Sequence, residues 1–282
     1  MTHIDFLVIG HIARDIATRG YLLGGAVAYG SITARNLGFK AGILTRAHDG
    51  FQPGEMLKGI ATHILPSEET TTFENRYQAG QRTQIIHACA RPITQHDVPE
   101  TWRDTKIVLL GPIAQEVDAS LASKFSDALV GASIQGWMRK WDSAGRVTSE
   151  PDLVRNIPFD RLQVVFLSEE DIAGNHTVLP WLTALGPIVV LTNGQYGSTI
   201  YHNGAVHHIT SRPAREMDPT GAGDVFAAAY LLRLSETQDI VQAAQFANVT
   251  ASFSVEAAGP TGIPDRQTVL GWMAHQDSGI AE

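Results

Sequence analysis

The chain contains a single cysteine, Cys89, in 282 residues, which excludes an intramolecular disulfide and a cysteine-rich zinc site. It also lacks an excess of positive charge. Its 21 Lys and Arg residues face 29 Asp and Glu, and the net charge of −8 excludes a general attraction to nucleic acid or an anionic membrane. The first ten residues contain Asp5 and an apolar run that is too short for a signal sequence or a membrane span. These absences favour a cytoplasmic protein, with Cys89 as a buried packing residue.

The common phosphate-binding patterns are missing as well. The chain has no Walker A sequence, and the turn around Gly221 and Gly223 does not complete a dinucleotide fingerprint, because Phe226 stands where the third glycine belongs. The eleven histidines show no metal-ligand spacing. If the chain binds phosphate, it must do so by another design.

Hydrophobicity alternates in a way typical of an α/β protein. Strand-length apolar runs are separated by helix-length periodic stretches, which predicts a mostly parallel sheet covered by helices on both faces. The expected strands are 6–9, 41–44, 107–110, 132–134, 164–167 and 188–191. The expected helices are 26–37, 116–129, 176–185, 222–234, 237–256 and 265–275. With 44% hydrophobic and 18% charged residues, we predict one domain over 1–282.

Two segments interrupt this alternation, approximately 12–24 and 70–88. Both are polar and rich in strand-forming residues, and the second contains a hairpin turn at 78–81. We predict that they form a small β lid beside the sheet. Lid strands can pair between two subunits, so a homodimer through these strands is a candidate assembly.

The segment from Asp218 to Asp224 runs directly into an apolar helix and predicts an anion-binding turn. Gly221 and Gly223 have no Cβ to block a close approach, so the amides from Gly221 through Ala222 and Gly223 to Asp224 can converge where the helix begins. A carboxylate among these donors is suited to taking up a proton. The combination indicates phosphoryl transfer to a hydroxyl, whereas the simpler alternative makes Asp224 an ordinary first-turn carboxylate.

Ligands of open parallel sheets bind at the carboxyl ends of the strands. This rule selects the polar or glycine-rich strand exits at 10–15, 111–112, 135–139, 168–171 and 193–194. We therefore expect these segments to lie around one cleft.

Five segments, in order along nearly the whole chain, resemble motifs of the PfkB or ribokinase-like carbohydrate kinases. Two resemble the family signatures, one resembles its N-x-x-E segment, one its nucleotide turn, and one the loop that flanks adenine and a monovalent cation. They are 24–38, 218–224, 166–171, 190–197 and 252–264. The resemblance implies a three-layer α/β/α fold with a mostly parallel central sheet and a small β lid, and ATP-dependent phosphorylation of a hydroxyl.

The resemblance also implies roles for individual residues. Asp224 would be the general base, and the amides of Gly221, Ala222 and Gly223 the anion hole. Asp15 would hold acceptor hydroxyls, and Gly25 would let the acceptor approach the backbone. The implied nucleotide-binding residues are Ser168, Asn193, Gly194, Gly197 and Asn248. The implied metal-binding residues are Glu170 and Asp171 for Mg²⁺ through water, and Asp218 and Thr220 for a monovalent cation such as K⁺.

The chain departs from the family pattern at the acceptor and metal positions. Tyr29 stands where the family has an asparagine, so an aromatic wall would replace a polar contact to the acceptor. Ser168 and Asp171 replace the asparagine and glutamate of the N-x-x-E segment.

Further acceptor-side or phosphate-side residues come from other strand exits and from the lid. Arg139 is either a clamp for the γ-phosphate or a surface residue paired with Asp142. Asn75 on the lid either contacts the acceptor from above or lies on an exposed polar strand.

We predict a cytoplasmic kinase that uses ATP and Mg²⁺, with K⁺ as a further candidate, to phosphorylate a small sugar or cyclic polyol. A myo-inositol-like acceptor is preferred, and a nucleoside kinase of the same fold is the nearest alternative. A kinase-derived protein that binds ligand without turnover is the alternative from another class, and the changes at Ser168 and Asp171 motivate it. No nucleic-acid or membrane partner is expected.

Overall fold

The computed structural model describes residues 3–17, 20–78 and 81–277. In this part of the chain, nine strands form a central sheet in the order β15-β14-β13-β12-β9-β8-β1-β4-β5. The strands from β5 to β13 along this order run parallel, while β14 and β15 are antiparallel additions at one edge. The strands are β1 (Phe6–Ile9), β4 (Ala41–His48), β5 (Ala61–Ser67), β8 (Ile107–Leu110), β9 (Leu129–Ser133), β12 (Val164–Ser168), β13 (Ile188–Thr192), β14 (Ser198–His202) and β15 (Ala205–Ile209). The predicted mostly parallel sheet is confirmed.

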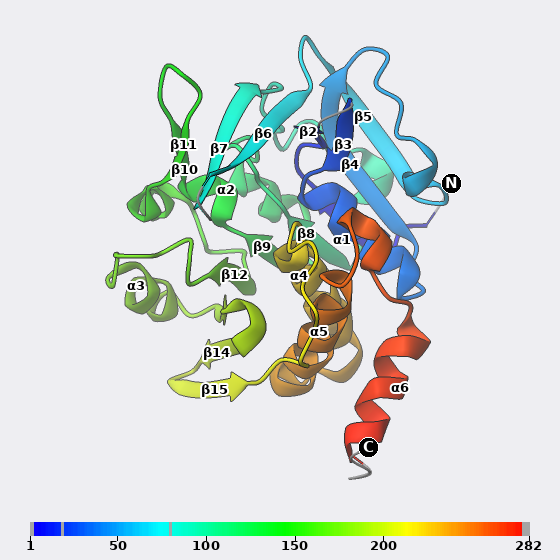
Figure 1. Ribbon diagram of the computed structural model, residues 1–282, viewed down its shortest axis with the longest axis vertical. Helices are drawn as coiled ribbons and strands as arrows, with labels where there is room; N and C mark the ends of the chain where they lie inside the picture. The colour runs from blue at the N-terminus through cyan, green and yellow to red at the C-terminus, as the bar shows by residue number, and fades with distance from the viewer. Residues whose placement is uncertain (1–2, 18–19, 79–80, 278–282) are drawn as a thin grey trace.

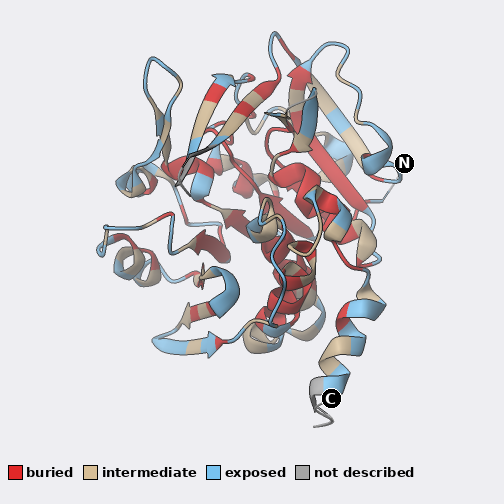
Figure 2. Ribbon diagram, viewed as in Figure 1, coloured by how far each residue is buried: buried red, intermediate tan, exposed pale blue. Residues whose placement is uncertain are grey.

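Both faces of the central sheet are covered, as the continuous apolar strands require. Because side chains alternate along a strand, Phe6 and Val8 of β1 pack into one core while Leu7 and Ile9 pack into the other. The first core lies against α1 (Ala26–Asn36), α4 (Ala222–Thr237) and α5 (Ile240–Ser254). The second lies against α2 (Gln135–Met138), α3 (Val178–Ala184) and several short 3₁₀ turns. Figure 2 shows the buried residues concentrated in these central layers.

The prediction of a helix over 116–129 is wrong. Only a 3₁₀ turn, η3 (Ala119–Lys124), forms there, and β9 already begins at Leu129. Glu116 turns back to accept the amides of Ile113 and Ala114, and Asp118 accepts that of Ser120 at 2.9 Å. Such local side-chain bonds offer the backbone an alternative to a helix. The apolar residues of the segment are buried, which is why its periodicity resembled that of a helix.

The remaining described helix, α6 (Arg266–Asp277), follows the 3₁₀ turn η6 (Gly259–Gly262) and carries the chain away from the body (Figure 1). Val269 is its buried contact with the first core. No helix in the described ranges is both long enough and apolar enough to cross a membrane.

A second, four-stranded sheet of described residues, here called the lid sheet, has the order β3-β2-β6-β7. Its strands are β2 (Ala13–Ile16), β3 (Tyr21–Gly24), β6 (Thr71–Gln78) and β7 (Gln81–Ala88). Figure 1 shows this sheet beside the central sheet, at the end where α1 begins. Part of the turn expected at 78–81 falls on residues 79–80, which lie outside the described residues.

The lid sheet is attached to the central sheet through His11, which follows β1. The His11 ring contacts Thr71 Oγ1 at 2.7 Å and Arg91 O at 2.8 Å, so it holds both ends of the β6–β7 hairpin. Burial lowers the pKa of His11, and a neutral ring can donate one of these bonds and accept the other.

A second attachment is the hairpin of β10 (Arg139–Trp141) and β11 (Val147–Ser149). Near its turn, Gly145 O accepts the amide of Ile86 in β7 at 2.8 Å. The lid sheet is therefore held on two sides. Cys89, just beyond β7, is exposed, so the prediction that it is buried is wrong; partial desolvation of its thiol still raises its pKa to about 11.

Candidate active site

The turn before α4 is built from glycine geometry and one carboxylate. Gly221 is the N-cap of α4 with φ 77° and ψ 1°, a left-handed conformation that favours glycine. Asp218 accepts the amide of Thr220 at 3.0 Å and the amide of Gly259 at 2.8 Å, which joins the turn to η6. Asp218 therefore holds together the loops to which the sequence assigned a monovalent cation.

The amides of this turn differ in availability. Ala222 donates to Pro219 O at 3.2 Å, closing the turn. No described residue accepts a hydrogen bond from the amides of Gly221, Gly223 or Asp224. Gly223 is exposed, and a Cβ built there would meet nothing within 4 Å. An anion can thus approach a helix start that keeps unpaired donors, although Ala222, one of the three predicted donors, already has a partner.

Asp224 is half-buried in the first turn of α4. Burial raises the pKa of its carboxyl to about 7; the positive charge of Arg139 lowers this pKa, and the negative charge of Asp171 raises it. These two influences place both charged groups near the Asp224 carboxyl. A carboxyl with a pKa near neutrality is matched to the work of a general base.

Arg139 and Asp171 are connected to each other by Gln135. Arg139 donates to Ile113 O and to Gln135 Oε1, both at 2.8 Å. The Gln135 amide donates to Asp171 Oδ1 at 2.8 Å, and the Ser168 amide donates to Asp171 Oδ2 at 2.8 Å. The exits of β9 and β12 are therefore linked, as the strand-end rule predicts. Ser168 and Asp171, at the positions altered from the family pattern, contact each other.

A polar cavity of about 230 Å³ opens beside this network. Its lining combines one cation, two carboxylates, amides, hydroxyls and one apolar side chain: Gln84, Gln135, Arg139, Val147, Thr148, Ser149, Glu170 and Asp171. The sequence offered no signal for Gln84, Thr148 or Ser149, because they come from β7 and β11 and carry no motif.

A second cavity, of about 150 Å³, lies at the start of α4 and has a more apolar lining. It brings together Gly194 and Gly197 of the predicted nucleotide turn, Asn248 of α5, and Ala222, Gly223 and Phe226 of α4. Asn193 does not line it and instead shapes the turn, where it accepts the Tyr196 amide at 2.9 Å.

Arg212, which the sequence did not single out, also lines the second cavity. It lies 4.0 Å from the centroid of the Phe253 ring and 2.7 Å from Glu256. No motif marked it, because its position depends on contacts with a helix distant in the chain.

The acceptor-side residues gather near the base of the lid sheet. A Cβ on Gly24 would overlap Asp15 Oδ2, so the bare glycine makes room for that carboxylate. Gly25 has φ 91°, and a Cβ there would overlap His11 O. The backbone therefore requires glycine at this position, whether or not a substrate approaches it. On β6, Asn75 accepts the Gln84 amide at 3.0 Å.

Tyr29 differs from the expected aromatic wall, because it is only 4% exposed. Burial and then the charges of Asp218, Asp15 and Asp224 raise the pKa of its hydroxyl.

Among the described residues, no group of three or more His, Cys, Asp or Glu side chains is placed to hold a metal ion directly. Glu170 is exposed and lines the polar cavity. Each carboxylate oxygen of Asp171 accepts one hydrogen bond, from Gln135 and from Ser168. This donor set fits a hydrated Mg²⁺ carried by phosphates, which keeps several of its waters.

The chain is similar in sequence to known kinases. Residues 163–266 match the family described as pfkB family carbohydrate kinase. A cytidine kinase of Thermococcus kodakarensis is 24% identical over 249 residues, covering 81% of this chain and 87% of the relative. An inositol 3-kinase of Arabidopsis thaliana is 25% identical over 278 residues, covering 90% of this chain and 74% of the relative.

Solved structures share the fold. A pyrophosphate-dependent kinase in the ribokinase family, complexed with a pyrophosphate analog and myo-inositol, has a TM-score of 0.75 at 20% identity, covering 94% of this chain and 99% of that one. Ribokinase of Arabidopsis thaliana, complexed with ribose and ATP, has a TM-score of 0.73 at 20% identity, covering 96% and 98%. The family match, the curated relatives and the shared fold together support a carbohydrate kinase of the PfkB, or ribokinase-like, family.

Proposed function

We propose that this kinase transfers the γ-phosphoryl group of ATP to a hydroxyl of a small sugar or cyclic polyol, with a myo-inositol-like acceptor preferred. One observation carries the proposal. Asp224, whose pKa burial raises to about 7, lies at a helix start whose amides at Gly221, Gly223 and Asp224 have no partner among the described residues. A proton acceptor and an anion site are thus adjacent.

The chemical step follows from this adjacency. The Asp224 carboxylate takes the proton of the acceptor hydroxyl, and the hydroxyl oxygen forms a bond to the γ-phosphorus. The bond between that phosphorus and the β,γ-bridging oxygen breaks, and ADP leaves with the electron pair. The Gly221 and Gly223 amides and the planar guanidinium of Arg139 are suited to the charge on the phosphoryl oxygens.

The acceptor is proposed to lie between Asp15 and Asn75, with its reacting hydroxyl toward Asp224. Asp15 would accept hydrogen bonds from hydroxyls, as its place against the bare Gly24 supports. A polyol is favoured over a nucleoside because Tyr29, only 4% exposed, has almost no ring face for a base. The polar cavity beside Arg139 has no aromatic residue in its described lining either.

The donor is proposed to be ATP rather than pyrophosphate. The more apolar cavity next to Gly223 and Phe226 is suited to binding a nucleoside. ATP contains a nucleoside, whereas pyrophosphate does not. Glu170 and Asp171 would hold Mg²⁺ through water, and Asp218 with Thr220 would hold a monovalent cation. When bound, Mg²⁺ would neutralise phosphate charge and orient the terminal phosphate.

A screen of phosphorylated products tests these assignments. ATP and pyrophosphate are each supplied with Mg²⁺ to inositols, pentoses, hexoses and nucleosides, and Asp224→Asn serves as the blank. We expect turnover with ATP and an inositol or sugar. Turnover with nucleosides alone would support the nucleoside-kinase alternative. Tight ligand binding without any turnover would support a silent binding protein.

We also propose that the protein acts in the cytoplasm and that two copies pair through their lid strands. Tyr21 and Leu22 of the edge strand β3 are 59% and 63% exposed, which supports pairing there. Light scattering after size-exclusion chromatography would detect the dimer. A monomer at high micromolar concentration would argue against it.

A further inference from the structure

Tyr29 has no surface to act as an acceptor wall, so its role lies among the groups it packs against. It comes from the first turn of α1, where its amide donates to Gly25 O at 3.4 Å, and it is 4% exposed. A large aromatic ring therefore lies in the interior of the protein beside the site.

The Tyr29 ring lies directly against the turn that begins α4. A Cβ built on Gly221 would overlap the ring atoms Cγ, Cδ1 and Cε1. A side chain at this position is thus opposed twice, by the φ of 77° and by the ring. Gly221 O accepts the amide of Val225 at 2.9 Å, the first hydrogen bond of α4. The ring therefore packs on Gly221, the N-cap residue whose conformation orients the first amides of α4.

The hydroxyl end of Tyr29 reaches the loop on the other side of the turn. It lies 3.9 Å from the Cβ position of Gly259, whose amide donates to Asp218 at 2.8 Å. Burial and the neighbouring carboxylates raise the pKa of Tyr29, so the hydroxyl keeps its proton at neutral pH. The side chain fills the space between α1, Gly221 and η6 without adding negative charge to a site for phosphates.

We propose that Tyr29 is a positioning residue for phosphoryl transfer, whose ring holds the Gly221 turn so that the amides of Gly221 and Gly223 face the cleft. The inference rests on the function proposed above, because it requires a phosphoryl group at these amides. It predicts that the ring matters more than the hydroxyl. It also predicts that loss of the ring affects the terminal phosphate of ATP more than the rest of the nucleotide.

Tyr29→Leu and the matched control Tyr29→Phe test this role. For each variant, kcat, the two KM values, and the Kd of ADP and of a non-hydrolysable ATP analogue are measured, and circular dichroism checks the fold. Tyr29→Leu is expected to lower kcat about 10- to 100-fold, as small misplacement of reacting groups does. It should weaken binding of the ATP analogue several-fold and binding of ADP by less than about twofold. Tyr29→Phe should keep kcat within about threefold of the wild-type value.

Three results would overturn the proposal. Tyr29→Leu could keep the wild-type kcat and the wild-type affinity for the ATP analogue, or kcat could fall equally in Tyr29→Leu and Tyr29→Phe. The third is that Tyr29→Leu weakens the binding of ADP as much as that of the analogue. If Tyr29→Leu does not fold, a more than tenfold loss of kcat in Tyr29→Phe still overturns it. A wild-type enzyme that neither binds ATP nor phosphorylates any acceptor refutes the proposed function instead, so the two failures are distinguishable.

The contact itself is tested by a double-mutant cycle that needs no activity. Gly221→Ala is introduced into the wild type and into Tyr29→Phe and Tyr29→Leu, and the melting temperatures are compared. With the ring present, the added methyl meets both strain and overlap; in Tyr29→Leu part of the overlap is removed. The melting temperature should therefore fall by fewer degrees in Tyr29→Leu than in the other two backgrounds. Additive effects would overturn the contact.

Discussion

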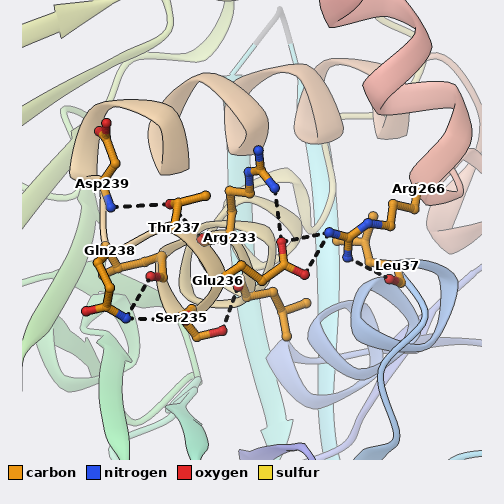
Figure 3. A network of polar contacts seen from close by, with 10 residues as sticks. Leu37, Arg233, Ser235, Glu236, Thr237, Gln238, Asp239 and Arg266 are labelled. Atoms are coloured by element: carbon orange, nitrogen blue, oxygen red, sulfur yellow. Dashed lines mark hydrogen bonds and ion pairs between the residues drawn. The ribbon is translucent and has the colours of Figure 1, made fainter.

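The two ends of α4 differ in whether their polar and charged groups are paired. At its C-terminal end, Glu236 accepts from Arg233 at 3.1 Å and from Arg266 at 2.7 Å, and Arg266 reaches Leu37 O at 3.4 Å (Figure 3). This network joins α4 to the last helix and to the end of α1. At the N-terminal end, the amides of Gly221, Gly223 and Asp224 have no described partner, and Asp224 has a raised pKa.

The difference separates what holds the helix from what the helix can do. Paired and partly exposed charges at the C-terminal end contribute to stability, though only about 0–1 kcal/mol for each pair. Unpaired donors and a partly desolvated acid at the N-terminal end are unfavourable for folding but are available to a ligand. Changes at the two ends should therefore separate activity from stability.

The largest expected effect is that of Asp224→Asn. Loss of the base should lower kcat by roughly 10²- to 10⁴-fold while the Kd of ATP changes little. Steady-state kinetics and calorimetry measure the two quantities. Turnover close to that of the wild type would remove Asp224 as the base.

The same variant should gain stability at alkaline pH. The folded pKa of Asp224 is about 7 and the reference value is 3.8, so the folded state binds this proton more tightly. Ionisation therefore destabilises the wild type increasingly as pH rises from about 4 to about 7, and fully above that. Asp224→Asn should melt higher than the wild type at pH 8, and this advantage should disappear near pH 4. An equal difference at both pH values would contradict the raised pKa.

Gly223→Ala should separate ligand access from packing at the same end of α4. The new methyl meets nothing within 4 Å, and alanine is favoured over glycine in a helix by up to about 1 kcal/mol. We expect unchanged or higher thermal stability together with a loss of kcat of at least about tenfold, because the methyl occupies the approach to the amides. Gly221→Ala is the contrasting control, since it should lower stability. Full activity in Gly223→Ala would argue against phosphate binding there.

A smaller effect concerns the pH dependence of kcat/KM. The base works as the carboxylate, so kcat/KM should rise through pH 7 and level off above it. Because the Asp171 charge raises the pKa of Asp224, Asp171→Asn should move the midpoint to lower pH. Because the Arg139 charge lowers it, Arg139→Gln should move the midpoint the other way. Shifts in the same direction would exclude this electrostatic arrangement.

Glu236→Gln should have the smallest effect and acts on stability alone. It weakens two ion pairs whose side chains are 22% to 34% exposed, so we expect a loss of about 1 kcal/mol, or a few degrees in melting temperature. Differential scanning calorimetry measures the change, and kcat should stay within about twofold of the wild type. A large loss of kcat would show that the two ends of α4 are coupled.

Several features were predictable because they depend on neighbours in the chain. Apolar runs such as Phe6–Ile9 became buried strands, and Gly38, with φ 92°, ends α1 as expected. The helix expected over 116–129 failed because Glu116 bonds to backbone amides outside its own segment. Periodicity reports burial, and here burial was achieved without a helix.

The sequence by itself determined the layered α/β fold, the glycine turn before α4 and the presence of Asp224 in it, because periodicity and backbone freedom are local properties. Only the tertiary structure decided what surrounds that turn. It buried Tyr29 beneath Gly221, brought Arg139 and Asp171 near Asp224 from the exits of separate strands, and added Gln84 and Thr148 to the cavity lining. Distances between groups far apart in the chain set burial and charge interactions, and no local pattern encodes them.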